Sequence, residues 1–193
     1  MVKIGVLISG SGTNLQSLID NAENGNIDGK IAVVISNRED AYGLERARQK
    51  NIPAVYINRR DYGNFDEFNS AIIEELKRHD VELVVLAGYL KILSSEFIDE
   101  YRNRIINIHP SLIPSFCGKG YYGIKVHEEA VEYGVKLSGA TVHFVDEGAD
   151  TGAIIIQEAV KVDSGDTAGS LQRKVLKVEH KILPLAVKYY CEG

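Results

Sequence analysis

The sequence predicts an α/β fold: a Rossmann-like, mostly parallel twisted sheet with helices on both faces and an antiparallel strand pair near the C-terminus. Three observations predict it. Apolar runs suited to strands buried on both faces alternate with helix-periodic segments in the first two thirds of the chain. A glycine-rich turn joins the first such run to the first helical pattern. Two further strand patterns, at 138–145 and 153–162, then follow with no helix between them, as in an antiparallel pair.

The composition is that of an ordinary globular protein that can bury a sizeable core. Of its 193 residues 45% are hydrophobic and 25% are charged, and the formal net charge is −5. The basic residues are scattered, which argues against a nucleic-acid partner. No apolar run could span a bilayer and no signal peptide is recognisable, so we expect no membrane association and a cytoplasmic location. Residues 1–193 should form a single domain.

The two cysteines predict neither a disulfide framework nor a zinc site. Cys117 and Cys191 lie far apart in the sequence and lack the spacing of metal ligands. Cys117 also has no base at short spacing, so we do not expect it to act as a nucleophile.

The first predicted strand, over 2–8, ends in the turn Ser9-Gly10-Ser11-Gly12-Thr13-Asn14, and a helix with apolar residues at helical spacing follows. Helix N-terminal amides point at an anion in this geometry, and glycines let it approach. The turn matches neither the dinucleotide fingerprint nor the Walker loop, so a phosphate monoester is the favoured ligand. The alternative is a tight turn in which Thr13 or Asn14 merely caps the helix.

The segments that follow continue the alternation of strands and helices. Strands are predicted over 30–35, 53–57 and 81–87, and helices over 42–50, over 65–78, and from a Ser94 cap to about residue 101. The loop after the short strand contains Arg59 and Arg60. These arginines could reach a phosphate held by the first turn, but a solvated pair on a loop is at least as plausible.

An apolar loop follows the strand at 81–87. It contains Tyr89, Leu90, Lys91, Ile92 and Leu93. Such a loop could form the wall of a site for a flat, aromatic ligand, although core packing is slightly favoured.

The stretch 105–114 contains the main candidate for a catalytic centre. Ile105 and Ile106 indicate a buried strand, and alternation places Asn107 and His109 on one face at its end, before two prolines turn the chain. An amide can hydrogen-bond a developing oxyanion, and an imidazole can carry a proton near neutral pH. Chemistry in open α/β sheets commonly occurs at such strand ends. From these two residues alone, a strand end that only ties down a turn is about equally expected.

The C-terminal third contains a helix over 124–133, the antiparallel pair, and a closing helix over 167–189 that Pro184 should kink or break. His127 on the first helix is expected to be a surface or structural residue. His143, in the middle of a strand, is expected to be a satisfied core histidine rather than a catalyst. The loop 146–152 contains three carboxylates. One of them could orient or charge His109, or the loop could be an exposed acidic hairpin.

Several of these segments together resemble one family. They are Val6–Gln16, Ile35–Arg38, Leu86–Tyr89, Asn107–Pro114, Val142–Glu147 and Glu179–His180. The sequence is similar to the glycinamide ribonucleotide (GAR) formyltransferases, the folate-dependent enzymes of purine synthesis. The segments occur in family order and cover nearly the whole chain. The asparagine–histidine motif is shared by all folate formyltransferases and deformylases, and the Ser-Gly-x-Gly-x-Asn loop makes the combination much more specific.

The resemblance implies the formyltransferase fold and the transfer of a formyl group from 10-formyltetrahydrofolate to the amine of GAR, without a metal. Asn107, His109 and Asp150 match the catalytic trio of the family. The N-terminal half would bind the nucleotide and the C-terminal half the folate. The matched binding residues are Gly12, Thr13 and Asn14 for the phosphate, Glu179 for the amine end of GAR, and Tyr89, Leu90, Lys91, Ile92, Leu93, Asn107, Asp146, Glu147, Gly148, Ala149 and Asp150 for the folate.

Some positions match the family less closely. Arg60 corresponds to a basic phosphate contact, but Arg59 competes for that role. Lys91 stands where the family often has arginine, so the fixed fork of donors is lost and the folate contact there should differ. The resemblance also implies a cis Ile113–Pro114 bond. We expect small-molecule partners only and a monomer or homodimer.

The chemistry that the resemblance implies agrees with the residues. A neutral amine attacks the formyl carbon, Asn107 and protonated His109 stabilise the oxyanion, and Asp150 favours the imidazolium. A formyltetrahydrofolate deformylase is the nearest alternative, but it should carry an additional N-terminal regulatory domain. A methionyl-tRNA formyltransferase should carry a tRNA-binding domain and a basic surface. A non-catalytic phosphate-binding module would have no use for a converging trio.

Overall fold

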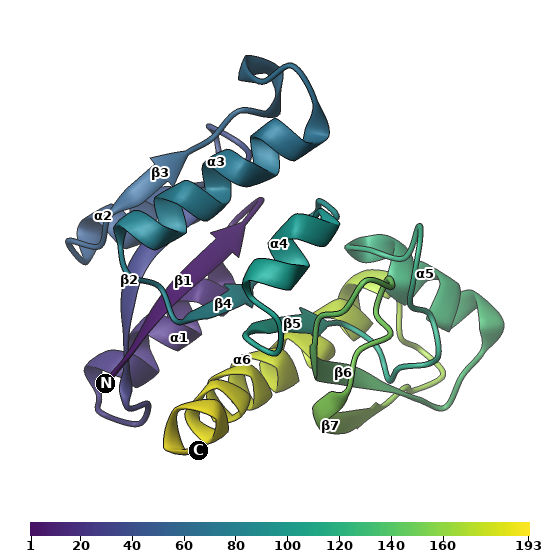
Figure 1. Cartoon of the computed structure of the whole chain (residues 1–193). Helices are drawn as coiled ribbons and strands as arrows, with labels where there is room; N and C mark the ends of the chain where they lie inside the picture. Colours follow the sequence, from purple (N-terminus) through teal and green to yellow (C-terminus); the bar gives the residue numbers. More distant parts are fainter.

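The computed structural model describes residues 1–193 and contains one seven-stranded sheet with the strand order β3-β2-β1-β4-β5-β6-β7 (Figure 1). Strands β1 to β5 are mutually parallel, and β6 and β7 run antiparallel to their neighbours, so the predicted mixed sheet is confirmed. The strands are β1 (Val2–Ile8), β2 (Gly29–Ser36), β3 (Ala54–Tyr56), β4 (Leu83–Leu86), β5 (Ile105–His109), β6 (Leu137–Phe144) and β7 (Ile154–Lys161).

Helices cover both faces of this sheet. They are α1 (Thr13–Glu23), α2 (Tyr42–Gln49), α3 (Phe65–Arg78), α4 (Ser95–Glu100), α5 (Ile124–Tyr133), α6 (Ala168–Glu192) and a 3-10 turn, η1 (Arg59–Asp61). A core of 17 buried apolar residues lies between the sheet and α3 and α4. A larger core of 27 residues lies on the opposite face, under α1, α2, α5 and α6. Apolar burial on both faces explains why the central strands read as continuous apolar runs.

The position of the site follows from the strand order. The chain moves outward from β1 through β2 to β3, and α3 then returns it to β4 on the other side of β1. The loops that leave β1 and β4 therefore diverge at their carboxyl ends, and open α/β sheets bind their ligands at such a switch point. The end of β5 lies beside β4 at the same edge.

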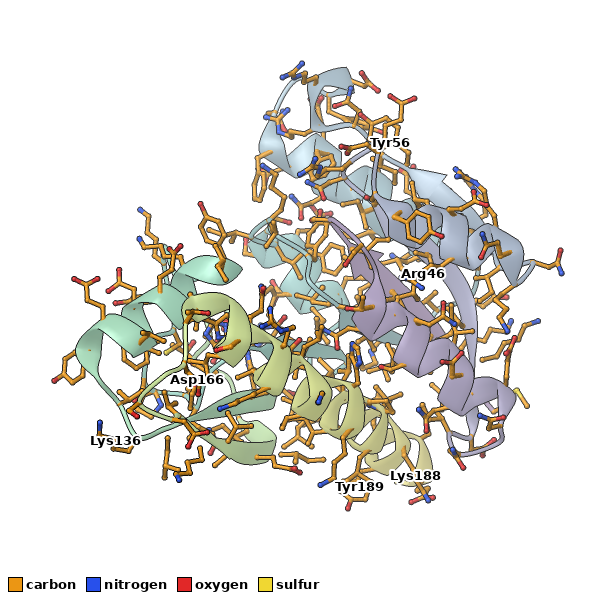
Figure 2. The ribbon with its side chains drawn as sticks, turned by 180° about the vertical axis from the view of Figure 1, so that it is seen from behind. Arg46, Tyr56, Lys136, Asp166, Lys188 and Tyr189 are labelled. Carbon is orange, nitrogen blue, oxygen red and sulfur yellow. The ribbon has the colours of Figure 1, made fainter.

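The closing helix differs from its prediction. Pro184 does not break α6, which continues to Glu192 and so ends three residues beyond the predicted limit of 189. Proline removes one helical hydrogen bond, but Leu183 before it and Ala186 after it are fully buried, and this apolar contact keeps the helix on the sheet. Figure 2 shows α6 crossing the rear of the molecule, from near Asp166 to Lys188 and Tyr189 in its last turns. No helix is long and apolar enough to cross a bilayer.

Candidate active site

A cavity of about 760 Å³ lies at the carboxyl ends of β1, β4 and β5. The β6–β7 loop, the loop at 118–123 and one face of α6 close its remaining sides. Most of the site residues expected from the sequence line it: Thr13, Asn14, Tyr89, Leu90, Lys91, Ile92, Leu93, Asn107, His109, Asp146, Glu147, Gly148, Ala149, Asp150 and Glu179. The structure therefore brings segments from both halves of the chain into one cavity.

Strand β5 positions Asn107 and His109 at the cavity. Its neighbours are β4, which pairs Leu86 with Asn107, and β6, which pairs His143 with Asn107. Ile106 and Ile108 alternate with the two polar residues and pack into the larger core, as the strand period requires. The side chains of Asn107 and His109 are thus fixed by a strand that is hydrogen-bonded on both edges.

Asp150 meets both residues from the loop between β6 and β7. Its Oδ2 atom accepts a hydrogen bond of 2.8 Å from the backbone N–H of Gly118 and lies 3.5 Å from Nδ1 of His109. Its Oδ1 atom lies 3.5 Å from Nδ2 of Asn107. The loop is therefore not an exposed acidic hairpin at this residue, because Asp150 converges with Asn107 and His109.

A hydrogen bond to one backbone carbonyl fixes the His109 ring. Its Nε2 atom lies 2.9 Å from the Phe116 carbonyl, which can only accept, so Nε2 carries a proton and Nδ1 faces Asp150. Burial lowers the pKa of His109, against the opposing influence of the Asp150 carboxylate and the Phe116 carbonyl. A proton added to Nδ1 would face a carboxylate, so the charge on His109 depends on Asp150.

The pKa of Asp150 lies below the ordinary value for a carboxyl group. Burial alone would raise it, but the His109 imidazole and the Gly118 N–H, which donates to Oδ2, act against burial and the pKa is lowered. Asp150 is therefore ionised at neutral pH, as a partner for an imidazolium must be.

His143 is a member of this cluster that sequence reasoning did not place there. It is a buried strand residue, as expected, with 1% of its surface exposed. Its Nδ1 atom lies 2.7 Å from the Phe144 carbonyl, so Nδ1 is the donor, and its Nε2 atom accepts from Nδ2 of Asn107 at 3.1 Å. The same Nε2 atom is 3.6 Å from Asp150. One amide proton of Asn107 is thereby used, and the other makes only the long contact with Asp150.

The opposite side of the cavity contains the glycine-rich turn and the start of α1. The helix begins at Thr13, its N-cap is Gly12 in the left-handed conformation, and no side chain caps it. The alternative to a phosphate site, a turn in which Thr13 or Asn14 caps the helix, is therefore not observed. The backbone N–H groups of Gly12, Thr13 and Asn14 donate to no acceptor in the protein. Free amides at a helix N-terminus suit an anion.

Asn14 instead bonds to α6. Its Nδ2 atom donates to Oε2 of Glu179 at 2.6 Å, while its Oδ1 atom is buried without a partner. Burial raises the pKa of Glu179, and the hydrogen bond from Asn14 only partly offsets this. A buried carboxylate and an unpartnered amide oxygen both favour a ligand that donates hydrogen bonds here.

The loop after β4 forms the wall of the cavity next to this turn. Ser9 holds it, because the Ser9 hydroxyl accepts from the N–H of Leu90 at 2.9 Å and donates to Asn37 at 2.6 Å. Tyr89 is buried, as core packing would require, but its hydroxyl has no partner and its pKa is raised by burial. Leu90 and Ile92 are 52% and 72% exposed. They are therefore available to a ligand, as expected if this loop forms the wall of a ligand site rather than part of the core.

The sequence and the fold of the chain are both similar to those of known proteins. A family model described as formyl transferase matches residues 2–187. The phosphoribosylglycinamide formyltransferase of Haemophilus influenzae is 44% identical over 193 residues, which are 100% of this chain and 89% of that protein. The crystal structure of glycinamide ribonucleotide transformylase 1 from Symbiobacterium toebii superposes with a TM-score of 0.95 at 47% identity, over 100% of this chain and 89% of that one.

The chain belongs to the formyl transferase family. The resemblance to its GAR formyltransferases is thereby confirmed. A human trifunctional purine biosynthetic protein is also 44% identical over 191 residues, 99% of this chain. The chain spans only 18% of the length of that relative and 14% of its Chironomus tentans counterpart.

Two of the residues matched to the formyl transferase family do not line the cavity. Gly12 is buried against α2, where a Cβ atom would come within 2.6 Å of the Cα atom of Gly43. Arg60 is exposed on η1 and contributes only its backbone N–H, to Asn58, while Arg59 bonds to the Tyr62 carbonyl. Neither arginine side chain reaches the turn after β1, so the contact of Arg60 with a phosphate stays a prediction.

His127 is the third histidine that lines the cavity, after His109 and His143. It is 1% exposed, so it is structural rather than a surface residue, and its Nδ1 atom has no partner. Burial, with a smaller influence of His109, lowers the pKa of His127 to about 4.

The Ile113–Pro114 bond is cis, as the resemblance implied. No group of three or more metal-ligating side chains is present, and metal-free chemistry stays a prediction.

Proposed function

We propose that the chain transfers a formyl group from 10-formyltetrahydrofolate to the amine of GAR, giving formylglycinamide ribonucleotide and tetrahydrofolate in de novo purine biosynthesis. The observation that carries this proposal is the convergence of Asn107, His109 and Asp150 in a cavity whose other side has free helix amides. We propose further that residues 1–193 act as one formyltransferase domain. A cytoplasmic location and a monomer or homodimer stay predictions.

GAR would bind at the side of β1 and α6. Its phosphate would accept from the amides of Gly12, Thr13 and Asn14, and its amine end would donate to Glu179. The free state of those amides and the burial of Glu179 beside Asn14 support this orientation. Arg60 is the proposed additional phosphate contact, and it would have to extend from η1 to reach it.

10-Formyltetrahydrofolate would bind between the loop at Tyr89–Leu93 and the loop at Asp146–Asp150. Leu86, Ile98 and Val145 provide apolar walls there. The buried, unpartnered hydroxyl of Tyr89 supports a polar ligand at this wall, because such groups are normally satisfied. The cavity of about 760 Å³ lies within the range of small-molecule sites. Lys91 would contribute a point charge, without the fork of donors of an arginine.

The reaction forms a bond between the amine nitrogen of GAR and the formyl carbon and breaks the bond from that carbon to the folate nitrogen. Negative charge develops on the formyl oxygen. The amide proton of Asn107 that makes only the long contact with Asp150, and the positive charge of protonated His109, would stabilise it. The proton lost by the amine must reach the departing folate nitrogen, and we propose a water held by Asp150 as its carrier. Asp150 would also favour the imidazolium of His109.

Two alternative functions are less well supported. A deformylase would use water in place of GAR and would need neither the free amides at α1 nor the buried Glu179 in the same cavity. A non-catalytic phosphate-binding module would need the amides but not the trio. The anion side and the trio together therefore favour transfer to a phosphorylated amine.

A coupled assay tests this function. The purified chain is incubated with GAR and 10-formyltetrahydrofolate, and tetrahydrofolate is followed with and without GAR. We expect turnover that depends on GAR. Turnover at the same rate without GAR would identify a deformylase, and no turnover in either mixture would leave only a binding function.

A further inference from the structure

We infer that Arg46, on α2, is a positioning residue for the phosphate of the substrate: it orients the turn after β1 and supplies positive charge behind it. This inference rests on the proposed function, since it concerns the phosphate of GAR. Arg46 does not line the cavity, so it would act through the turn rather than by contact with the phosphate. Figure 2 shows Arg46 between α2 and α1.

Helix α2 holds two consecutive carbonyl groups of the turn. The backbone N–H of Gly43 donates to the Gly10 carbonyl at 3.1 Å. Nε of Arg46 donates to the Ser11 carbonyl at 2.8 Å, and its Nη1 atom donates to Oε1 of Gln16 on α1 at 3.2 Å. The guanidinium thereby links the turn, α1 and α2.

These contacts determine the direction of the free amides. In a trans peptide the carbonyl of one residue and the N–H of the next point in opposite directions. Because the Ser11 carbonyl points at Arg46, the N–H of Gly12 points away from α2. That N–H is one of the donors without an acceptor in the protein. Removing Arg46 would free the Ser11 peptide to rotate and would weaken the alignment of the amides.

The close approach of α2 depends on two glycines. A Cβ atom on Gly12 would come within 2.6 Å of the Cα atom of Gly43, and the Gly12 φ angle of +69° favours glycine. This contact brings the first turn of α2 against the phosphate side of the cavity. Arg46 therefore lies where its charge can act on a bound anion.

Charge is scarce on this side of the cavity. The only lysine or arginine side chains that line the cavity are Lys91 and Lys119, which come from the loops after β4 and β5 rather than from the turn after β1 or from α1. Arg46 makes no ion pair with a carboxylate, and its guanidinium instead lies 5.0 Å from the centre of the Tyr42 ring. Its charge is therefore not neutralised within the protein and can favour a phosphate at the α1 amides.

The test compares Arg46→Gln, Arg46→Lys and the matched control Arg48→Gln, which changes an exposed arginine of the same helix that pairs with Glu45. For Arg46→Gln we expect the KM for GAR to rise about ten-fold, with kcat and the KM for 10-formyltetrahydrofolate unchanged. Arg46→Lys should recover part of the loss, because it keeps the charge but not the two-point contact. Arg48→Gln should match the wild type.

The phosphate-free riboside of GAR separates a specific effect from general damage. Wild type and Arg46→Gln should use it equally poorly. If Arg46→Gln loses kcat/KM by the same factor on GAR and on the riboside, or if its KM for GAR is unchanged, the inference is wrong.

Titration of the ¹⁵N-labelled protein with inorganic phosphate provides a readout that does not need activity. The Gly12 and Thr13 amide signals should shift, and in Arg46→Gln this shift should need about ten-fold more phosphate. If the wild type fails to formylate GAR, the proposed function is wrong, but the phosphate titration still tests the role of Arg46. Equal titration curves for wild type and Arg46→Gln would exclude that role.

Discussion

The Nδ1 atom of His109, at the end of β5, lies 3.5 Å from Oδ2 of Asp150 in the β6–β7 loop. Burial lowers the pKa of His109 and the Asp150 carboxylate raises it, so the two effects oppose each other at one ring nitrogen. The Gly118 N–H, which donates to the same oxygen, ties this pair to the loop after β5. The protonation of His109 therefore depends both on its burial at the end of β5 and on the position of a loop residue.

Asn107→Ala should lower kcat on the order of 100-fold or more, because it removes a donor to the oxyanion. The KM for GAR should change little, since the amide contributes to the transition state rather than to substrate binding. Steady-state kinetics measure both constants, and thermal unfolding checks that the variant is folded despite the lost bond to His143. A kcat within a few fold of the wild type would remove Asn107 from the mechanism.

Asp150→Asn should keep the shape of the loop, since an amide oxygen can still accept from Gly118, but it removes the negative charge beside His109. We expect a strong loss of kcat and a shift of the alkaline limb of its pH profile to lower pH, because the imidazolium is less favoured. Asp28→Asn, at an exposed aspartate, is the control. Turnover of Asp150→Asn near that of this control would exclude the assignment.

The stability of the protein should fall in acid partly through His127. Its pKa is lowered to about 4 in the folded state, from an ordinary value near 6.5, so the unfolded chain binds this proton more readily. The contribution of His127 is complete above about pH 6.5 and is lost as the pH falls toward about 4. The free energy of unfolding of His127→Gln, measured by denaturant titration across this range, should depend less steeply on pH than that of the wild type. Parallel curves would contradict the lowered pKa.

Tyr89→Phe should leave the free energy of unfolding unchanged or raise it by about 1 kcal/mol, because the buried hydroxyl has no partner to lose. Ser9→Ala is the matched comparison: its buried hydroxyl bonds to both Asn37 and the Leu90 N–H, so we expect a loss of about 1–3 kcal/mol. Denaturant unfolding in the absence of ligand measures both. An equal loss of unfolding free energy in Tyr89→Phe and Ser9→Ala would show that the Tyr89 hydroxyl is hydrogen-bonded within the protein.

Much of the fold could be predicted because periodicity reports burial. The helix predicted over 65–78 has those bounds in the structure, and Ser94 caps α4 as expected. Pro184 does not break the closing helix, because the buried residues on both sides of it, which a local rule about proline does not consider, hold the helix on the sheet. A helix that is fixed by its neighbours tolerates a missing hydrogen bond that an isolated helix would not.

The site was predictable where its residues stand at the ends of apolar runs, as Asn107 and His109 do. His143 was not, because its contact with Asn107 depends on the register of β5 against β6, which the sequence pattern does not contain. Arg46 was missed for the same kind of reason, since its partner Ser11 lies on another element. An apolar pattern shows which face of a strand is buried, but not which residue of the next strand lies opposite.

The fate of the formyl carbon tests the central claim most directly. The chain is given GAR and 10-formyltetrahydrofolate with a ¹³C-labelled formyl group, and the products are followed by NMR. We predict that the label appears on the amine nitrogen of GAR in an amount equal to the tetrahydrofolate formed, and that Asn107→Ala abolishes most of this transfer. Label that accumulates as free formate, at the same rate with and without GAR, would contradict the account.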